Sequence, residues 1–170
     1  MGMDVYGKNP VINPKSIKPP QINYVEASDE ERKSYFDASG KYESENPGIY
    51  FRANVWSWRP IHSLICKFCD EHLEETGKIL IEEPVLISMG MNEGSGAEEE
   101  WQCKELAKRF DKWMEHNVNG VSSSVALAST PEGMVVSALG GGETPSYSTN
   151  DEHLKEFVRF LENCGGFEVW

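Results

Sequence analysis

Apolar residues recur at helical spacing in two stretches of the chain. In residues 96–117 they keep the 3.6-residue period of one helix face, at Cys103, Leu106, Ala107, Phe110, Trp113 and Met114. Ser95 and Glu98 form a capping-box pattern ahead of this helix. A second apolar set is Ile61, Leu64, Ile65, Phe68 and Leu73. It predicts a helix with Pro60 in its first turn that ends near Gly77.

Capping patterns predict two further helices. Ser28, followed by Glu31, predicts a short helix over residues 28–37 that Gly40 ends. Thr149, followed by Glu152, predicts a last helix that stops at Gly165 and Gly166. The apolar positions of that last helix are Leu154, Phe157, Val158 and Leu161.

Short apolar and alternating segments predict a small sheet. The N-terminal MDVYG and the C-terminal FEVW are expected to join it. IYFRANVWSWRP predicts either a strand or an entry into the next helix, and ILIEEPVLISM a strand pair or one strand broken at Pro84. Residues 124–128 and 134–138 predict a hairpin around a turn at 131–133, followed by a flexible stretch at 140–142.

These elements predict an α+β fold: a single compact, helix-dominated domain with about four helices and a small antiparallel sheet. Residues 1–7 are expected to form its N-terminal strand. Residues 8–27 contain four prolines, which favour extended conformations and predict an arm or insertion. Residues 28–170 are expected to form the globular domain.

The charge of the chain narrows the classes of function. Its 170 residues carry 16 Lys and Arg against 28 Asp and Glu, a net charge of −12. Lys8, Lys15 and Lys18 against Asp4 give residues 1–25 a charge of +2, so the rest carries −14. This excess disfavours direct nucleic-acid binding, which needs clustered cations, and permits partners with a basic surface.

The sequence predicts neither a membrane protein nor a secreted one. It has no apolar run long enough to span a bilayer, and residues 1–20 lack the apolar region of a secretory signal. Tyr6 stands where an N-myristoylation motif needs Ser or Thr. We therefore expect a cytoplasmic protein without a membrane partner, and four cysteines that are reduced thiols.

His62, Cys66 and Cys69 are the candidate metal ligands. On one helix they fall within about 60° of one another, so all three could point the same way. Zinc sites, however, draw their ligands from two or more elements, and this Cys-x-x-Cys lies inside a helix. We favour buried structural thiols, and we predict no cofactor.

The candidate ligand site is a block of aromatic and arginine residues near Tyr50. Arg52, Trp56, Trp58 and Arg59 could stack on a ring and pair with an anion, with Asn92 and Glu93 as further polar groups. They could equally pack in the core, which we favour. No phosphate-binding loop and no hydrolytic triad is present, so catalysis is not predicted.

Several segments together resemble an uncharacterised family of small bacterial and bacteriophage proteins: MGMDVYGKNP, GIYFRANVWSWRP, GMNEG and FLENCGGFEVW. In that family the first two segments are joined by a short loop, so the resemblance implies that the proline-rich arm and the helix at 28–37 are an insertion. Its recurrent residues fall here on Asp4, Tyr6, Gly7, Tyr50, Phe51, Arg52, Asn54, Trp56, Trp58, Arg59, Pro60, Asn92, Gly94, Gly165, Gly166 and Phe167. The resemblance implies a context in bacteria or their viruses and no particular activity.

Two hypotheses of function follow. The first is a non-enzymatic acidic protein that binds a protein partner with a basic surface, for example a phage-type inhibitor of a host nucleic-acid-binding protein. The second is a small-molecule or nucleotide-binding protein, with or without enzymatic activity, that uses the block at residues 50–60.

Overall fold

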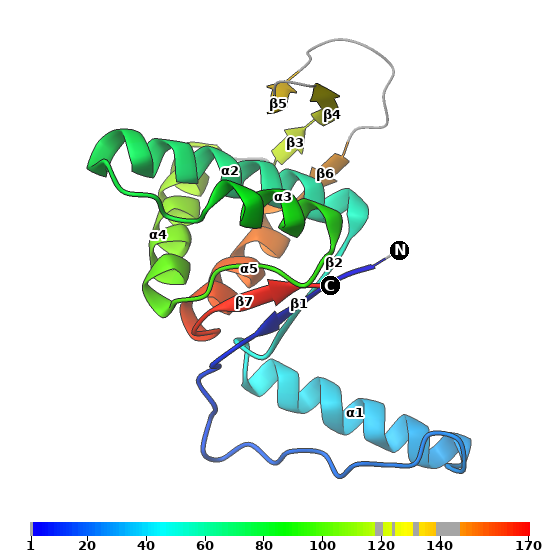
Figure 1. Cartoon of the computed structure of the whole chain (residues 1–170). Coiled ribbons are helices and arrows are strands. Elements are labelled where there is room, and N and C mark those ends of the chain that lie inside the picture. The colour runs from blue at the N-terminus through cyan, green and yellow to red at the C-terminus, as the bar shows by residue number, and fades with distance from the viewer. Residues whose placement is uncertain (1, 118–120, 124, 131–132, 139–146) are drawn as a thin grey trace.

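The computed structural model describes residues 2–117, 121–123, 125–130, 133–138 and 147–170. Within these residues the chain forms five helices and seven strands (Figure 1). The helices are α1 (Asp29–Glu45), α2 (Val55–Thr76), α3 (Glu83–Met91), α4 (Glu100–His116) and α5 (Asp151–Asn163). The strands are β1 (Gly2–Gly7), β2 (Tyr50–Asn54), β3 (Val121–Ser123), β4 (Val125–Thr130), β5 (Gly133–Ala138), β6 (Tyr147–Thr149) and β7 (Phe167–Val169). The predicted helix-dominated α+β fold is confirmed.

A three-stranded antiparallel sheet joins the two ends of the chain, as expected. Strand β1 lies in the centre, with β2 on one side and β7 on the other. Val5 is opposite both Phe51 and Val169, and all three side chains are buried on the inner face. The next residues along, including Tyr6 and Arg52, face outward and are exposed.

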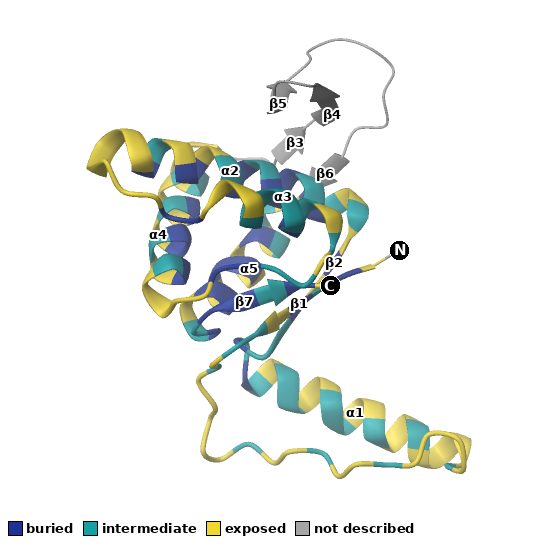
Figure 2. Cartoon of the chain, viewed as in Figure 1, coloured by how far each residue is buried: buried dark blue, intermediate teal, exposed yellow. Residues whose placement is uncertain are grey.

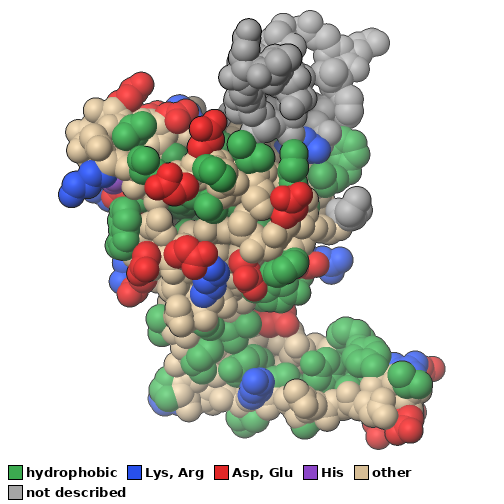
Figure 3. Space-filling model, viewed as in Figure 1, with side chains coloured by type: hydrophobic (Ala, Val, Ile, Leu, Met, Phe, Trp, Pro, Cys, Tyr) green, Lys and Arg blue, Asp and Glu red, His purple; other side chains and the backbone are tan. Residues whose placement is uncertain are grey.

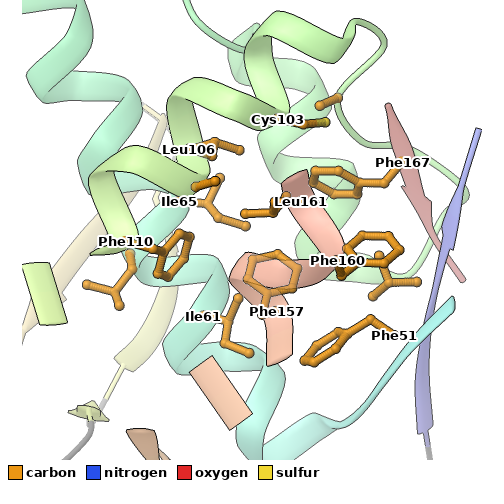
Figure 4. Packing of buried hydrophobic residues seen from close by; sticks show 14 of the residues in the cluster. Phe51, Ile61, Ile65, Cys103, Leu106, Phe110, Phe157, Phe160, Leu161 and Phe167 are labelled. Carbon is orange, nitrogen blue, oxygen red and sulfur yellow. The ribbon is translucent and has the colours of Figure 1, made fainter. Parts of the chain in front are cut away.

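The core lies between the inner face of this sheet and helices α2, α4 and α5. Phe157 of α5 is at its centre, with its ring centroid 4.9 Å from that of Phe51 and 5.4 Å from that of Phe110 (Figure 4). Phe160 and Phe167 extend the same cluster toward β7. Aromatic contacts therefore connect strands β2 and β7 to α4 and α5.

Residues 8–48 form a projecting module, which leaves the body at the end of β1 and returns at the start of β2 (Figure 1). At its base the Gly7 N–H donates to the Ile49 carbonyl at 3.0 Å. A Cβ on Gly7 would lie 1.9 Å from the Gly48 carbonyl oxygen, so only glycine allows this approach.

Within the module the arm runs beside α1. The Arg32 guanidinium donates to the Tyr24 carbonyl at 2.9 and 3.2 Å, and the Asn13 N–H donates to the Asn46 side chain at 2.7 Å. No residue of α1 is buried (Figure 2). Helix α1 is therefore in contact with the arm, and the division of the chain expected at residue 28 stays a prediction.

Two helix boundaries predicted from glycine and proline are wrong. Helix α1 continues through Gly40 to Glu45, although its predicted Ser28–Glu31 capping box is confirmed. Helix α2 begins before Pro60, because the Asn54 side chain accepts hydrogen bonds from the N–H groups of Trp56 and Ser57, both at 2.9 Å. The predicted end at Gly77, in left-handed conformation, is confirmed.

The expected strands at Pro84 are also wrong, because residues 83–91 form helix α3 with Pro84 in its first turn. The predicted Ser95–Glu98 capping box is wrong, because helix α4 begins at Glu100 with Glu99 as its cap. There the Gln102 side chain accepts from the Glu98 and Glu99 N–H groups at 2.9 and 2.8 Å. The cap of α5 is Asn150 in place of Thr149. The hairpin of β4 and β5 is confirmed, while residues 131–132 and 140–142 lie outside the described residues.

Candidate functional site

An open cleft of about 520 Å³ lies between the C-terminal half of α2, the loop that follows it and the start of α3. Helix α2 contributes residues spaced three or four apart, so they share one face of the helix. We call this the acidic cleft, and it is lined by Cys66, Cys69, Asp70, Leu73, Ile79, Leu80, Ile81, Glu82, Glu83, Pro84, Leu86 and Ile87.

The acidic cleft combines apolar surface with carboxylates. Leu73 and Ile79 are 45% and 54% exposed, which is unusual for large aliphatic side chains beside a cavity. The charged lining residues are Asp70, Glu82 and Glu83, and no Lys or Arg is among the lining residues. Figure 3 shows acidic and apolar side chains side by side over α2 and α3.

Two other carboxylates of α2, Glu71 and Glu75, have a cationic partner. Arg109 of α4 lies 2.8 Å from Glu105 and 2.7 Å from Glu75, and its side chain is only 11% exposed. His72 is 3.3 Å from the same Glu105 oxygen. In contrast, within the described residues Asp70, Glu82 and Glu83 make no ion pair. These three cleft carboxylates therefore keep their negative charge without a cation beside them.

The thiols beside the cleft are poor nucleophiles. Burial raises the pKa of Cys66 to about 11 and that of Cys69 to about 12, and the Asp70 carboxylate adds to the first shift. A thiol with such a pKa is almost entirely protonated at neutral pH. This chemistry does not support covalent catalysis at the cleft.

The candidate metal ligands lie close together but have other contacts. Nε2 of His62 is 2.7 Å from the Leu86 carbonyl and 3.7 Å from the Cys66 sulfur. Burial lowers the pKa of His62, which keeps its ring neutral. Among the residues that the structure describes, no group of three or more His, Cys, Asp or Glu side chains is arranged to hold a metal ion.

The arginine and tryptophan block is divided between core and surface. Trp58 is 1% exposed, and its indole N–H donates to the Met89 carbonyl at 3.2 Å. Trp56 is 48% exposed at the start of α2, Arg59 is half-buried on the same helix, and Arg52 is exposed on the outer face of the sheet. None of these residues lines the acidic cleft.

Asn92 and Glu93 lie at the C-terminal end of α3. Asn92 has the left-handed φ of 64° that ends the helix, and a Glu93 oxygen accepts from the Ser88 hydroxyl at 3.4 Å. Neither lines the cleft. Asn92 therefore ends α3, and Glu93 follows it.

Sequence reasoning did not identify the acidic cleft, although one signal was present. Leu73 follows Phe68 at a step of five, off the apolar stripe, and it is exposed in the cleft. A second signal was the pair Glu82 and Glu83 between two apolar runs. Taken alone, these patterns are equally typical of irregular helix spacing and of a strand break, and neither indicates that residues 83–91 are helical.

Comparison with models of protein families, with curated proteins and with solved structures found no match to this chain. The resemblance to small bacterial and bacteriophage proteins therefore stays a prediction. None of the helices in the described residues combines the length and the apolar character needed to cross a membrane.

Proposed function

We propose that this is a non-enzymatic binding protein whose acidic cleft holds a segment of a partner protein that is both apolar and basic. The observation that supports this most is the lining of the cleft, in which exposed Leu73 and Ile79 lie beside carboxylates without any cation. An amphipathic helix with Lys or Arg beside its apolar stripe matches this chemistry.

The two kinds of lining group have different effects on binding. Burial of aliphatic side chains supplies affinity, at about 25 cal/mol per Å² of apolar surface removed from water. The carboxylates speed the encounter with a cationic segment and select against acidic ones. A basic segment of a host nucleic-acid-binding protein would suit such a cleft, in keeping with an inhibitor from a bacterial virus.

The test uses a synthetic amphipathic helical peptide of Leu and Lys, with a Leu and Glu peptide of the same pattern as its counterpart. Titration calorimetry should show binding of the Lys peptide alone, with affinity that falls as the salt concentration rises. Replacing Leu73 and Ile79 with Ser should weaken binding at least about tenfold, because the apolar contact is lost.

Charge reversal provides the matched control. The double variant Glu82→Lys with Glu83→Lys should lose most of the affinity for the Lys peptide. The double variant Asp37→Lys with Asp111→Lys has the same net charge, but both substitutions lie on exposed positions outside the cleft. Equal losses in the two variants would show that only overall charge matters and would contradict a site at the cleft.

The alternative of a nucleotide site at residues 50–60 has less support. Trp58 packs in the core and is unable to stack on a ligand without local unfolding. The remaining exposed members, Arg52 and Trp56, are separated by the cap of α2 at Asn54.

A further inference from the structure

Strand β2 forms an edge of the three-stranded sheet, and the hydrogen bonds of β1 show which way its backbone groups point. The Asp4 N–H donates to the Trp170 carbonyl at 2.7 Å, and the Trp170 N–H donates to the Asp4 carbonyl at 2.8 Å. Asp4 therefore bonds toward β7. Because successive residues of a strand bond to opposite sides, Met3, Val5 and Gly7 bond toward β2.

The register of β1 with β2 then fixes the direction of the β2 groups. Met3 is opposite Ala53 and Val5 is opposite Phe51, so Phe51 and Ala53 bond to β1. The N–H and C=O groups of Tyr50 and Arg52 point away from the sheet. Within the described residues no hydrogen bond outside the sheet engages the main chain of either residue.

The outward-pointing N–H groups of Asn54 and of β7 already have hydrogen-bond partners. Asn54, the next outward-pointing residue of β2, donates its N–H to the Ser57 hydroxyl at 3.2 Å as part of the α2 cap. On the far side, β7 is covered by the segment before α4, because the Phe167 N–H donates to the Ala97 carbonyl and the Val169 N–H to the Ser95 carbonyl. The open part of the sheet edge is therefore confined to Tyr50 and Arg52.

The side chains at this edge define the charge of a matching segment. Arg52 is exposed and makes no ion pair within the described residues. The nearest carboxylate in register is Asp4, which instead accepts a hydrogen bond from the Tyr50 hydroxyl. The Arg52 guanidinium is thus available to a carboxylate on an added strand.

We propose that the open edge of β2 accepts an extended segment of a partner protein with an Asp or Glu opposite Arg52. Up to four main-chain hydrogen bonds would form with Tyr50 and Arg52, and the ion pair would fix the register. This edge is distinct from the acidic cleft, and the proposal does not depend on the cleft having a ligand. Its alternative is that Arg52 only prevents strand pairing at a short edge.

Amide hydrogen exchange of the free protein tests whether the N–H groups of Tyr50 and Arg52 point away from the sheet. Phe51 and Ala53 should be protected, while Tyr50 and Arg52 should exchange at least about tenfold faster.

The binding test adds an acetylated peptide, Thr-Val-Thr-Glu-Thr-Val-Thr, as the extended segment. Saturating peptide should slow exchange at Tyr50 and Arg52 at least about tenfold. Unchanged exchange at both amides with peptide at millimolar concentration would overturn the proposal.

Two variants distinguish the effect of the main-chain hydrogen bonds on binding from the effect of the Arg52 charge. Arg52→Ala keeps the outward N–H and removes the charge, so it should weaken binding of the Glu peptide to the level of a peptide with Gln in that place. Arg52→Pro also removes the N–H, which the pairing with β1 does not use, and binding should be lost. If the proline variant does not fold, the same peptide with N-methylated alternate residues makes this distinction on the unchanged protein. Binding of the methylated peptide as tight as that of the parent would refute strand addition.

Discussion

At the scale of single residues, His62 is the group whose surroundings have the clearest consequence for stability. It is 8% exposed, and its Nε2 lies 2.7 Å from the Leu86 carbonyl, which the neutral ring satisfies by donating its proton. Gly90 leaves room for the ring, because a Cβ there would lie 3.0 Å from Cε1 of His62. Burial lowers the pKa of His62; the hydrogen bond to the Leu86 carbonyl opposes this shift, and the nearby charge of Arg59 adds to it.

This shift predicts a loss of stability in acid. The unfolded chain binds a proton at His62 near the ordinary value of 6.5, whereas the folded protein binds it only at lower pH. The contribution of neutral His62 to the free energy of unfolding is therefore complete above pH 6.5. It is lost as the pH falls toward the pKa of His62 in the folded protein, by up to about 1.4 kcal/mol per pH unit. Urea unfolding between pH 8 and pH 5 measures it.

The variant His62→Gln is the control for this prediction. Glutamine keeps an N–H donor for the Leu86 carbonyl and has no titrating group, so its stability should vary less over the same pH range. Equal pH dependence of the two proteins would assign the acid sensitivity to other groups.

At the scale of elements, two glycines in helices have opposite roles. Gly40 lies inside α1, and a Cβ added there would have no other atom within 4 Å, so Gly40→Ala should stabilise α1 by about 0.5–1 kcal/mol. Gly77 ends α2 with a φ of 68°, so Gly77→Ala should cost roughly 1 kcal/mol. Amide exchange in α1 and thermal unfolding of the body measure the two effects. A stabilising Gly77→Ala would contradict the left-handed end of α2.

The projecting module should be dispensable for folding of the body. Gly7 and Ile49 form a hydrogen-bonded pair, which a two-residue Asn-Gly turn can close in place of residues 8–48. We expect the shortened chain to unfold cooperatively and to keep its affinity for the Leu and Lys peptide. It should be somewhat less stable, because Asn9 and Val11 donate to carbonyls at the end of α5 at 3.0 and 2.8 Å. A shortened chain without a cooperative transition would show that the module is part of the core fold.

The elements that the sequence predicted correctly are those with strong local signals. The alternation of MDVYG and FEVW, the stripe of α4 and the Ser28 cap all appear in the structure. The errors occurred where two local signals compete. At α2, the capping side chain of Asn54 determines the start of the helix, and Pro60 lies inside it. At α3, Pro84 lies in the first turn of a helix although the flanking residues favour strands.

The acidic cleft was not predictable in the same way. Its lining comes from a helix face, a loop and a second helix, and no local motif indicates that these three meet. The division of the arginine and tryptophan block has a similar cause. Trp56 and Trp58 are two residues apart, so on a helix they point in different directions, one to solvent and one to the core.

At the scale of the whole molecule, the charge of −12 leaves many described carboxylates without an ion pair, and the three that line the acidic cleft are among them. The Arg109 cluster joins α2 to α4, and the Arg109 side chain is 11% exposed, whereas its partners Glu75 and Glu105 are 58% and 23% exposed. The carboxylates of the acidic cleft are exposed and repel one another. Their repulsion destabilises the free protein and is relieved when a cation binds.

This distribution predicts that added salt stabilises the protein. Screening shortens the range of repulsion from about 30 Å at 0.01 M salt to about 8 Å at 0.15 M. The pairs of the mostly buried Arg109 guanidinium lose less, because their atoms are only 2.7 and 2.8 Å apart. We expect the Tm to rise by about 2–4 °C over this range, in line with a gain of about 1 kcal/mol. The double variant Glu82→Gln with Glu83→Gln should reduce that rise more than Asp37→Asn with Asp111→Asn. A Tm that falls with salt would mean that the ion pairs outweigh the repulsion, so that the cleft would hold no excess charge for a basic partner.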